Sequence, residues 1–258
     1  MTAEHTTDTP PLLLLVHGAW HGAWCWAGLQ ARLDALGVAS MAIDLPGHGT
    51  STEPPGDLYG DAQHVADVIA ALARPVVLVG HSYGGAVITE AATRAGGGVV
   101  HLVYLTAFAI DEGETIMGFL RSQPAAPSSL GAAMQMRDDG TSVLDPALGT
   151  AALYGTTPAA LVPAALARLC PQPMATFGQP ATGSPRDVVP STYLVCDLDQ
   201  AIAPDHQLAL AARCTRTVTF HTDHSPFMSM PDETAELLSD VVRSVGSDLQ
   251  SPAQLAGG

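Results

Sequence analysis

Short apolar runs recur along most of the chain and are separated by longer segments of mixed character. Six of these runs are four to seven residues long and lack polar alternation, at 12–16, 39–43, 76–79, 99–105, 192–196 and 217–220. A strand that is apolar throughout is covered on both faces, as the strands of parallel sheets are. The runs therefore predict six strands of a mostly parallel sheet.

The segments between these strands carry helical periodicity. Helices are predicted at 24–36, 61–73, 85–94, 205–212 and 232–245, and the last has apolar residues spaced three and four apart from Leu237 to Val245. Pro231 followed by Asp232 is typical of a helix start. Strands that alternate with helices predict an α/β fold, a six-stranded sheet flanked by helices, built from residues 1–106 and 191–258.

The alternation stops between residues 107 and 190. This stretch is rich in Pro, Ala, Gly and Met and shows no clear strand. A loop of that length without structure of its own is uncommon in a compact domain, so we expect a partly helical insertion over 107–190. Residues 247–258, which close on Gly257 and Gly258, are expected to form a disordered tail.

Composition and charge narrow the range of partners. Of the 258 residues, 47% are apolar and 14% charged, and the net charge of −15 includes ten arginines and no lysine. Without a basic stripe to follow a phosphate backbone or an anionic lipid surface, neither nucleic acid nor a membrane is an expected partner. The expected partner is a small-molecule substrate, and a homodimer is left open.

Cysteine spacing and the N-terminal region bear on location. The four cysteines are widely spaced and form no Cys-x-x-Cys pair, which argues against a zinc or dithiol site and favours reduced thiols in the cytoplasm. The apolar run at 12–16 is too short for a signal-peptide core or a membrane span. A cytoplasmic protein is therefore predicted.

A candidate nucleophile lies in the segment Gly80-His81-Ser82-Tyr83-Gly84. A predicted strand precedes it and a predicted helix follows, so the turn between them is sharp and its central residue strained, often with positive φ. Small residues at 80 and 84 allow the strand and the helix to approach each other. This context favours Ser82 as a nucleophile, with the Tyr83 main-chain N–H beside it to stabilise an oxyanion, over an ordinary glycine-rich turn.

A second oxyanion donor is expected in the loop after the first strand. Acyl transfer by this kind of turn requires a further N–H from an early strand–helix loop. The main-chain N–H of Ala19 fits this role, and Gly18 would let the substrate approach. His17 and His21 lie four apart, as metal ligands on a helix do, but glycines at 18 and 22 exclude a helix and no third ligand is evident. No metal is expected.

The base and the acid should follow the nucleophile along the chain. His224 lies in the loop after the last predicted strand and is favoured over His221, which is closer to the strand. Asp197 and Asp199 both follow the predicted strand 192–196. The hydrogen bond to the histidine must come from a residue just beyond the strand end, and Asp199 is favoured over Asp197. Asp223, next to the base, is expected to stay solvated.

Five segments resemble the α/β-hydrolase superfamily, and more narrowly the group of plant methylesterases, hydroxynitrile lyases and related bacterial esterases. They are Val-His-Gly-Ala-Trp-His-Gly-Ala-Trp-Cys-Trp (16–26), Asp-Leu-Pro-Gly-His-Gly (44–49), Gly-His-Ser-Tyr-Gly-Gly (80–85), 193–204 and 224–229. The resemblance implies that Asp199 is the acid and that 107–190 forms a cap over the active site. In this group the lyases have a Thr at position 18 and a Lys at position 225. The chain has Gly18 and Ser225, so the resemblance implies an esterase.

These features together predict a carboxylic ester hydrolase without a cofactor. It would cleave an ester, thioester or lactone of a small, largely apolar substrate through an acyl-enzyme on Ser82. The predicted substrate-binding residues, which should line an apolar pocket, are Gly18, Trp20, Tyr83, Phe108, Phe119, Met134, Met136 and Phe177. A dinucleotide site at Gly47-His-Gly49 is excluded because Thr52 replaces the third glycine.

Two other functions stay open at this point. One is a biosynthetic tailoring enzyme that uses the same pocket for cyclisation, lactonisation or elimination. The other is a ligand-binding protein with little turnover. Fold and candidate triad alone do not separate them from a hydrolase.

Overall fold

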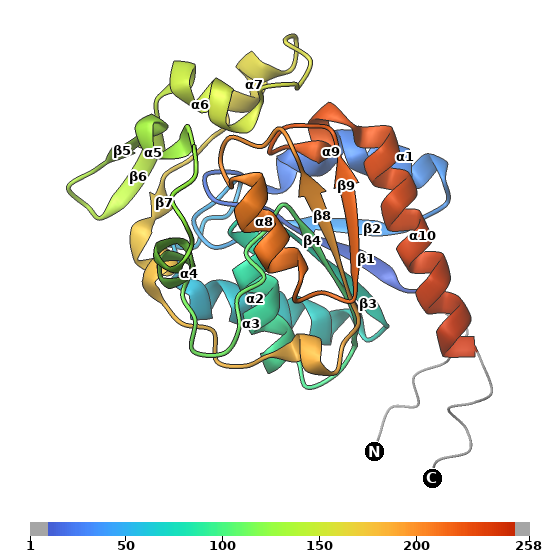
Figure 1. Ribbon diagram of the computed structural model, residues 1–258. Helices are drawn as coiled ribbons and strands as arrows, with labels where there is room; N and C mark the ends of the chain where they lie inside the picture. Colours follow the sequence, from blue (N-terminus) through green and yellow to red (C-terminus); the bar gives the residue numbers. More distant parts are fainter. Residues whose placement is uncertain (1–9, 251–258) are drawn as a thin grey trace.

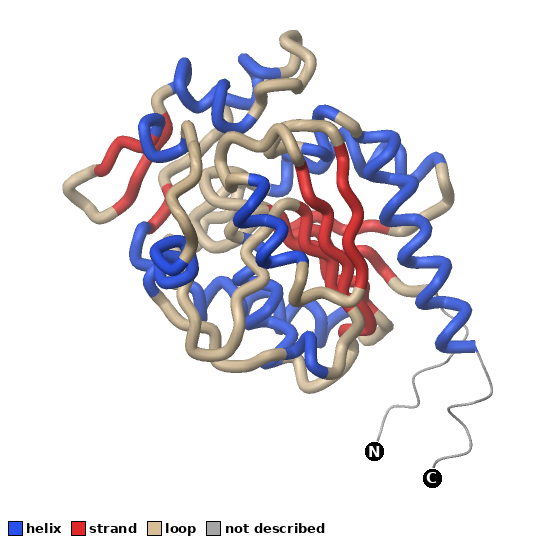
Figure 2. Tube along the Cα trace, in the orientation of Figure 1, coloured by secondary structure: helices blue, strands red, loops and turns tan. Residues whose placement is uncertain are grey.

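The computed structural model describes residues 10–250, and a six-stranded parallel sheet forms its centre (Figure 2). The strand order is β2-β1-β3-β4-β8-β9, and every pair of neighbours is parallel. The strands are β1 (Leu12–Val16), β2 (Ser40–Ile43), β3 (Val76–His81), β4 (Val99–Leu105), β8 (Ser191–Cys196) and β9 (Arg216–Phe220). This sheet confirms the predicted fold.

The predicted strand boundaries differ from the observed ones mainly at β3. The prediction ends at Val79, whereas the strand continues to His81. Gly80 pairs with Val16 of β1 and Tyr104 of β4, so ladder partners on both sides extend the strand through a residue of low strand propensity. The strand therefore ends at the residue before Ser82, and the nucleophile turn begins at Ser82 itself.

Two apolar layers cover the sheet. Alternate residues of each strand point to opposite faces: Leu14 and Val16 of β1 join one buried cluster, and Leu13 and Leu15 join the other. Helices α2, α3 and α8 cover the first face, and α1 and α10 cover the second (Figure 1). These helices are α1 (Ala27–Ala35), α2 (Leu58–Leu72), α3 (Gly84–Arg94), α8 (Pro204–Ala211) and α10 (Pro231–Gln250).

The helices differ from prediction at two ends. The segment predicted as one helix over 24–36 begins with the 3₁₀ helix η1 (Ala23–Trp26), which α1 follows. Helix α10 continues to Gln250, so residues 247–250 of the predicted disordered tail are helical, and 251–258 lie outside the described residues. Among the helices of residues 10–250, none combines the length and the apolar character needed to cross a bilayer.

The segment between β4 and β8 is partly helical, as expected, but it also contains strands that the sequence does not reveal. A small antiparallel sheet in the order β5-β6-β7 lies apart from the central sheet. Its strands are two to four residues long, too short to show a periodic pattern. The elements are α4 (Ile116–Ser122), α5 (Leu130–Ala133), β5 (Met134–Met136), β6 (Thr141–Leu144), α6 (Pro146–Leu153), α7 (Val162–Leu166), β7 (Gln172–Pro173), η2 (Met174–Gly178) and η3 (Pro185–Asp187).

Candidate active site

Ser82 occupies a sharp turn between β3 and α3. Its φ is +53°, a left-handed conformation that is strained for a residue with a side chain, and it is 8% exposed. A Cβ on Gly80 would lie 2.5 Å from the Gly84 carbonyl oxygen, and one on Gly84 would lie 2.6 Å from the His17 carbonyl oxygen. Only glycine permits this approach, which lets β3, α3 and the loop after β1 meet at the turn.

His224 and Asp199 form a buried pair at the carboxyl ends of β8 and β9. Both residues are 1% exposed, and the His224 Nδ1–H donates to Asp199 Oδ2 over 2.6 Å. Because the carboxylate only accepts, the proton lies on Nδ1 and the lone pair of Nε2 is free to act as a base.

The Asp199 carboxylate is held by further donors. Oδ1 accepts from the main-chain N–H groups of Ala201 at 2.6 Å and Ile202 at 3.0 Å, and Oδ2 accepts from the Thr106 hydroxyl and from Gln207 Nε2. A buried anion is stable only when it is surrounded by donors in this way. Sequence reasoning missed Thr106 and Gln207. The position of Thr106, directly after β4, is the signal that could have revealed it.

The competing residues form a separate pair at the surface. His221 Nδ1 lies 3.0 Å from Asp197 Oδ1, with side chains 78% and 41% exposed. The structure thus places the two aspartate–histidine alternatives in different environments, and only Asp199–His224 is shielded from water.

Asp223 is buried, and the expectation that it stays solvated is wrong. It is 2% exposed, and its Oδ2 accepts from the N–H groups of Thr156 and Thr157 at 2.8 Å each and from the Thr157 hydroxyl at 2.9 Å. Its Oδ1 accepts from the Ser225 N–H. The segment between β4 and β8 supplies these partners, and their positions cannot be deduced from local sequence.

The nucleophile turn contacts His224 directly and is linked to Asp199 through the end of β4. Ser82 N–H donates to Leu105 O at the end of β4, immediately before the Thr106 that binds Asp199. On the other side, His81 Nε2–H donates to the His224 carbonyl oxygen over 2.7 Å, and the two rings lie 4.6 Å apart. Within residues 10–250, the structure contains no hydrogen bond between the Ser82 hydroxyl and the His224 ring.

Two buried histidines shape the loop after β1. His17 Nδ1–H donates to Gly18 O while its Nε2 accepts from the Leu45 N–H, and His21 Nδ1–H donates to Ala19 O. Burial lowers the pKa of His17 to about 3 and that of His21 to about 4, so both rings are neutral near pH 7. Both serve as hydrogen-bond partners of main-chain groups, and the described residues contain no cluster of three or more metal-ligating side chains.

The two predicted oxyanion donors are available. Within residues 10–250, neither the Ala19 nor the Tyr83 main-chain N–H donates to a protein acceptor. Gly18 packs against the nucleophile turn: a Cβ there would lie 2.8 Å from His81 Nδ1 and 2.9 Å from Ser82 Cβ. The glycine is therefore required for contact between these two segments, a role distinct from the predicted approach of substrate.

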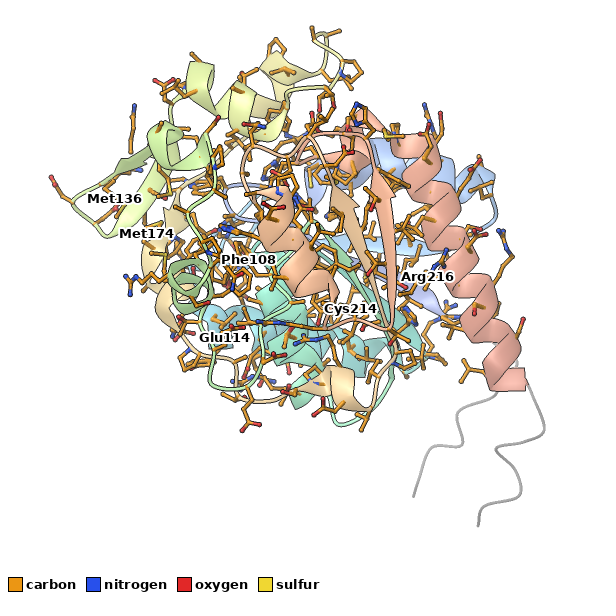
Figure 3. The ribbon with its side chains drawn as sticks, viewed as in Figure 1. Phe108, Glu114, Met136, Met174, Cys214 and Arg216 are labelled. Carbon is orange, nitrogen blue, oxygen red and sulfur yellow. The ribbon has the colours of Figure 1, made fainter. Side chains whose placement is uncertain are left out.

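The residues predicted to bind substrate lie in different surroundings. Met136 is 61% exposed on the β5–β6 hairpin at the rim of the molecule, so the structure does not support its place in a pocket (Figure 3). The Tyr83 side chain points away from the site, because its hydroxyl donates to Asp61 Oδ2 over 2.7 Å in the core. The others lie in or against the buried cluster on the face of the sheet that α2, α3 and α8 cover: Trp20, Phe108, Phe119, Met134 and Phe177.

A parallel sheet with Ser82 on a strained strand–helix turn, and with an acid and a histidine after later strands, defines the α/β-hydrolase class. The chain belongs to the Alpha/beta hydrolase family, whose model matches residues 13–237.

Similarity to individual proteins extends along most of the chain. The chain is 31% identical over 238 residues to Alpha/beta hydrolase nvfD of Aspergillus novofumigatus, and the alignment covers 86% of this chain and 92% of the relative. It is 27% identical over 260 residues to Methylesterase 2 of Arabidopsis thaliana, covering 91% and 95%. The structure of a pyrethroid hydrolase from Sphingobium faniae JZ-2 superposes with a TM-score of 0.79 at 26% identity, covering 91% of this chain and 98% of that one. These relatives confirm the predicted group and the enzyme class, a carboxylic ester hydrolase.

Proposed function

We propose that the protein hydrolyses a carboxylic ester, thioester or lactone of a small, largely apolar molecule through a Ser82–His224–Asp199 triad and an acyl-enzyme. One observation carries the proposal. The buried Asp199–His224 pair lies beside the strained Ser82 turn, where two main-chain N–H groups are free to bind an oxyanion. A nucleophile, an oriented base and oxyanion donors are the parts that acyl transfer requires.

The proposed reaction has two steps. His224 Nε2 takes the Ser82 proton as the hydroxyl attacks the carbonyl carbon, and the N–H groups of Ala19 and Tyr83 stabilise the oxyanion. The imidazolium then protonates the leaving alcohol, thiol or ring oxygen. In the second step His224 removes a proton from water as the water attacks the acyl-enzyme, and the imidazolium returns that proton to Ser82 Oγ as the acid leaves. Asp199 keeps the ring in its Nδ1–H form and stabilises its charge throughout. Rotation of the Ser82 side chain toward Nε2 accompanies substrate binding, since catalytic hydrogen bonds are often long in unliganded enzymes.

The electrostatics of the site favour an uncharged substrate. His17 and His81 carry pKa values lowered by burial, so they contribute no charge near pH 7, and the Asp199 carboxylate is fully engaged. The relatives fit this class by their names, which include methylesterases, a carbendazim hydrolyzing esterase and pyrethroid hydrolases. All four cysteines are unpaired, which supports the proposal of a cytoplasmic enzyme.

Active-site labelling tests the proposal. A fluorophosphonate probe should label the protein at Ser82, and the Ser82→Ala variant should not be labelled. The same variant should lose on the order of 10⁴–10⁶ in kcat on p-nitrophenyl and methyl esters of graded acyl size. Product analysis by mass spectrometry should show the free acid. Turnover that survives Ser82→Ala, or a cyclised product, would refute the proposal.

A further inference from the structure

One short segment between β4 and β8 forms hydrogen bonds with two of the three loops on which the proposed chemistry depends. It comprises residues 154–157, directly after α6, and we call it the cap bridge. Tyr154 is 2% and Thr157 7% exposed, so these two side chains are buried, whereas Gly155 and Thr156 between them are exposed. In Figure 1, α6 and α7 lie beyond the carboxyl ends of β8 and β9, where the loops that carry Asp199 and His224 begin.

The first contact reaches the oxyanion loop. The Tyr154 hydroxyl donates to His21 Nε2 over 2.8 Å, and His21 Nδ1–H donates to the Ala19 carbonyl oxygen over 2.8 Å. Both directions are fixed, because a carbonyl only accepts and a neutral imidazole then has a single acceptor nitrogen. Tyr154 thus acts through His21 on Ala19, the residue that offers the oxyanion donor.

The second contact reaches the loop of the base. Asp223 Oδ2 accepts three hydrogen bonds from Thr156 and Thr157, and the Asp223 N–H donates back to the Thr156 hydroxyl over 3.1 Å. The Asp223 Oδ1 accepts from the Ser225 N–H. His224 therefore lies between two residues whose positions are fixed by one carboxylate anchored to the cap.

Apolar packing ties the bridge to the loop of the acid as well. Tyr154 belongs to a buried cluster with residues of α6 and α7 and with Ala201, which follows the acid by two residues. The Ala201 N–H donates to Asp199. The bridge thus bonds the oxyanion loop and the base loop directly and shares an apolar cluster with the acid loop, and these three loops are far apart in the sequence.

We propose that the cap bridge positions the catalytic groups: Tyr154, Thr157 and Asp223 hold the Ala19 N–H and the His224 ring at the separation that acyl transfer needs. The inference rests on the proposed function, and it assigns part of the cap a role in catalysis itself besides covering the substrate. Buried hydrogen bonds suit such a role, since a low dielectric strengthens them and a fully satisfied network is rigid.

Two conservative variants with matched controls test the inference. Tyr154→Phe removes the hydroxyl that binds His21, and Tyr59→Phe removes a hydroxyl that bonds the cap at Pro180, away from the site. Thr157→Ala removes a cap hydroxyl from buried Asp223, and Thr182→Ala removes one from buried Glu90. Each pair removes the same hydroxyl group from a contact between cap and core. Tyr59 and Thr182 are more exposed than Tyr154 and Thr157, so the unfolding temperature of each variant separates loosening of the cap from displacement of the catalytic groups.

A positioning role predicts a specific kinetic pattern. Tyr154→Phe and Thr157→Ala should each lower kcat about tenfold. This decrease is smaller than that caused by removing an oxyanion donor, because the Ala19 N–H and the His224 ring are still present and are only displaced. KM should stay within about twofold for small and bulky esters alike. Affinity for a trifluoromethyl ketone, which forms a tetrahedral adduct with Ser82, should fall by a similar factor. Tyr59→Phe and Thr182→Ala should match the wild type, and thermal unfolding monitors folding of all four.

The opposite outcomes overturn the inference. If Tyr154→Phe and Thr157→Ala behave like their controls, or raise KM only for bulky esters, the segment merely lines or covers the pocket. Ser82→Ala, assayed in parallel, separates this failure from failure of the proposed function. An inactive Ser82→Ala beside an unaffected Tyr154→Phe rejects only the positioning role, whereas an active Ser82→Ala rejects the serine mechanism on which it rests.

Discussion

The Asp61 carboxyl in α2 should make the stability of the protein fall as the pH rises. It is 1% exposed, and one of its oxygens accepts from the Tyr83 hydroxyl while the other, Oδ1, is buried without a hydrogen-bond partner in the described structure. Burial raises its pKa from 3.8 to about 7, against the lowering effect of the Tyr83 hydrogen bond. Asp61→Asn keeps the shape and the Tyr83 contact but removes the charge.

The sign and size follow from linkage. The pKa of Asp61 is higher in the folded chain than in the unfolded chain, so between these two values the folded chain keeps a proton that the unfolded chain releases. The contribution of this group to the free energy of unfolding is therefore fully present below about pH 4 and is lost as the pH rises to about 7. A difference of roughly three pKa units corresponds to about 4 kcal/mol over the whole window. Between pH 5 and pH 8 the loss should be about 2–3 kcal/mol.

Urea unfolding at these two pH values measures the effect. With a slope of about 3 kcal/mol per molar for a chain of this size, the wild-type midpoint should drop by roughly 1 M more than that of Asp61→Asn. The comparison cancels His17 and His21, whose lowered pKa values act in the opposite direction: their stabilisation is present above about pH 6.5 and is lost as the pH falls. Asp67→Asn, an exposed change on the same helix, is the control. Equal pH dependence in wild type and Asp61→Asn would refute the reasoning.

Three further predictions concern the candidate site. Asp199→Asn should lower kcat by a factor on the order of 10³–10⁴, because the amide no longer holds His224 in its Nδ1–H tautomer. Asp197→Asn changes an exposed pair and should leave ester turnover near that of the wild type. Equal effects of the two substitutions would contradict the assignment of the acid. Gly18→Ala places a Cβ 2.8 Å from His81 Nδ1, so it should lower the free energy of unfolding by about 1–3 kcal/mol and reduce kcat. An unchanged urea midpoint would show that the loop after β1 shifts to accept the Cβ without cost. Met136→Ala should leave kcat/KM within about twofold for every ester tested, because the Met136 side chain is 61% exposed. A decrease in kcat/KM for bulky esters alone would show that Met136 does line the substrate pocket.

The sequence predicts the fold and the nucleophile turn because each depends on local signals. Apolar runs predicted all six strands of the central sheet, since strands buried on both faces leave little choice of residue. The Gly80 and Gly84 pattern around Ser82 encodes a close approach of strand and helix that no larger residue allows. The place of Asp199 beyond the strand end favoured it over Asp197, and the resemblance to known hydrolases supported that preference.

Long-range contacts explain what the sequence could not predict. The short strands β5, β6 and β7 have no periodic pattern, and β7 pairs with β6 across about 30 residues of sequence. The burial of Asp223 depends on Thr156 and Thr157, which lie 66 or 67 residues away. Met136 has a flexible apolar side chain of the kind that lines substrate pockets, but it lies exposed on a hairpin at the rim of the molecule.

The sequence by itself therefore determined the order of the elements, the parallel sheet and the residue types that its carboxyl edge presents. Hydrophobic periodicity and glycine spacing act over a few residues, so they can be recognised without knowing the neighbours. Tertiary structure alone decided which aspartate is shielded from water, which histidines are neutral and which cap residues support the catalytic loops. Burial and hydrogen bonding depend on groups that approach only when the chain is folded, and these two quantities set both pKa values and the geometry of the site.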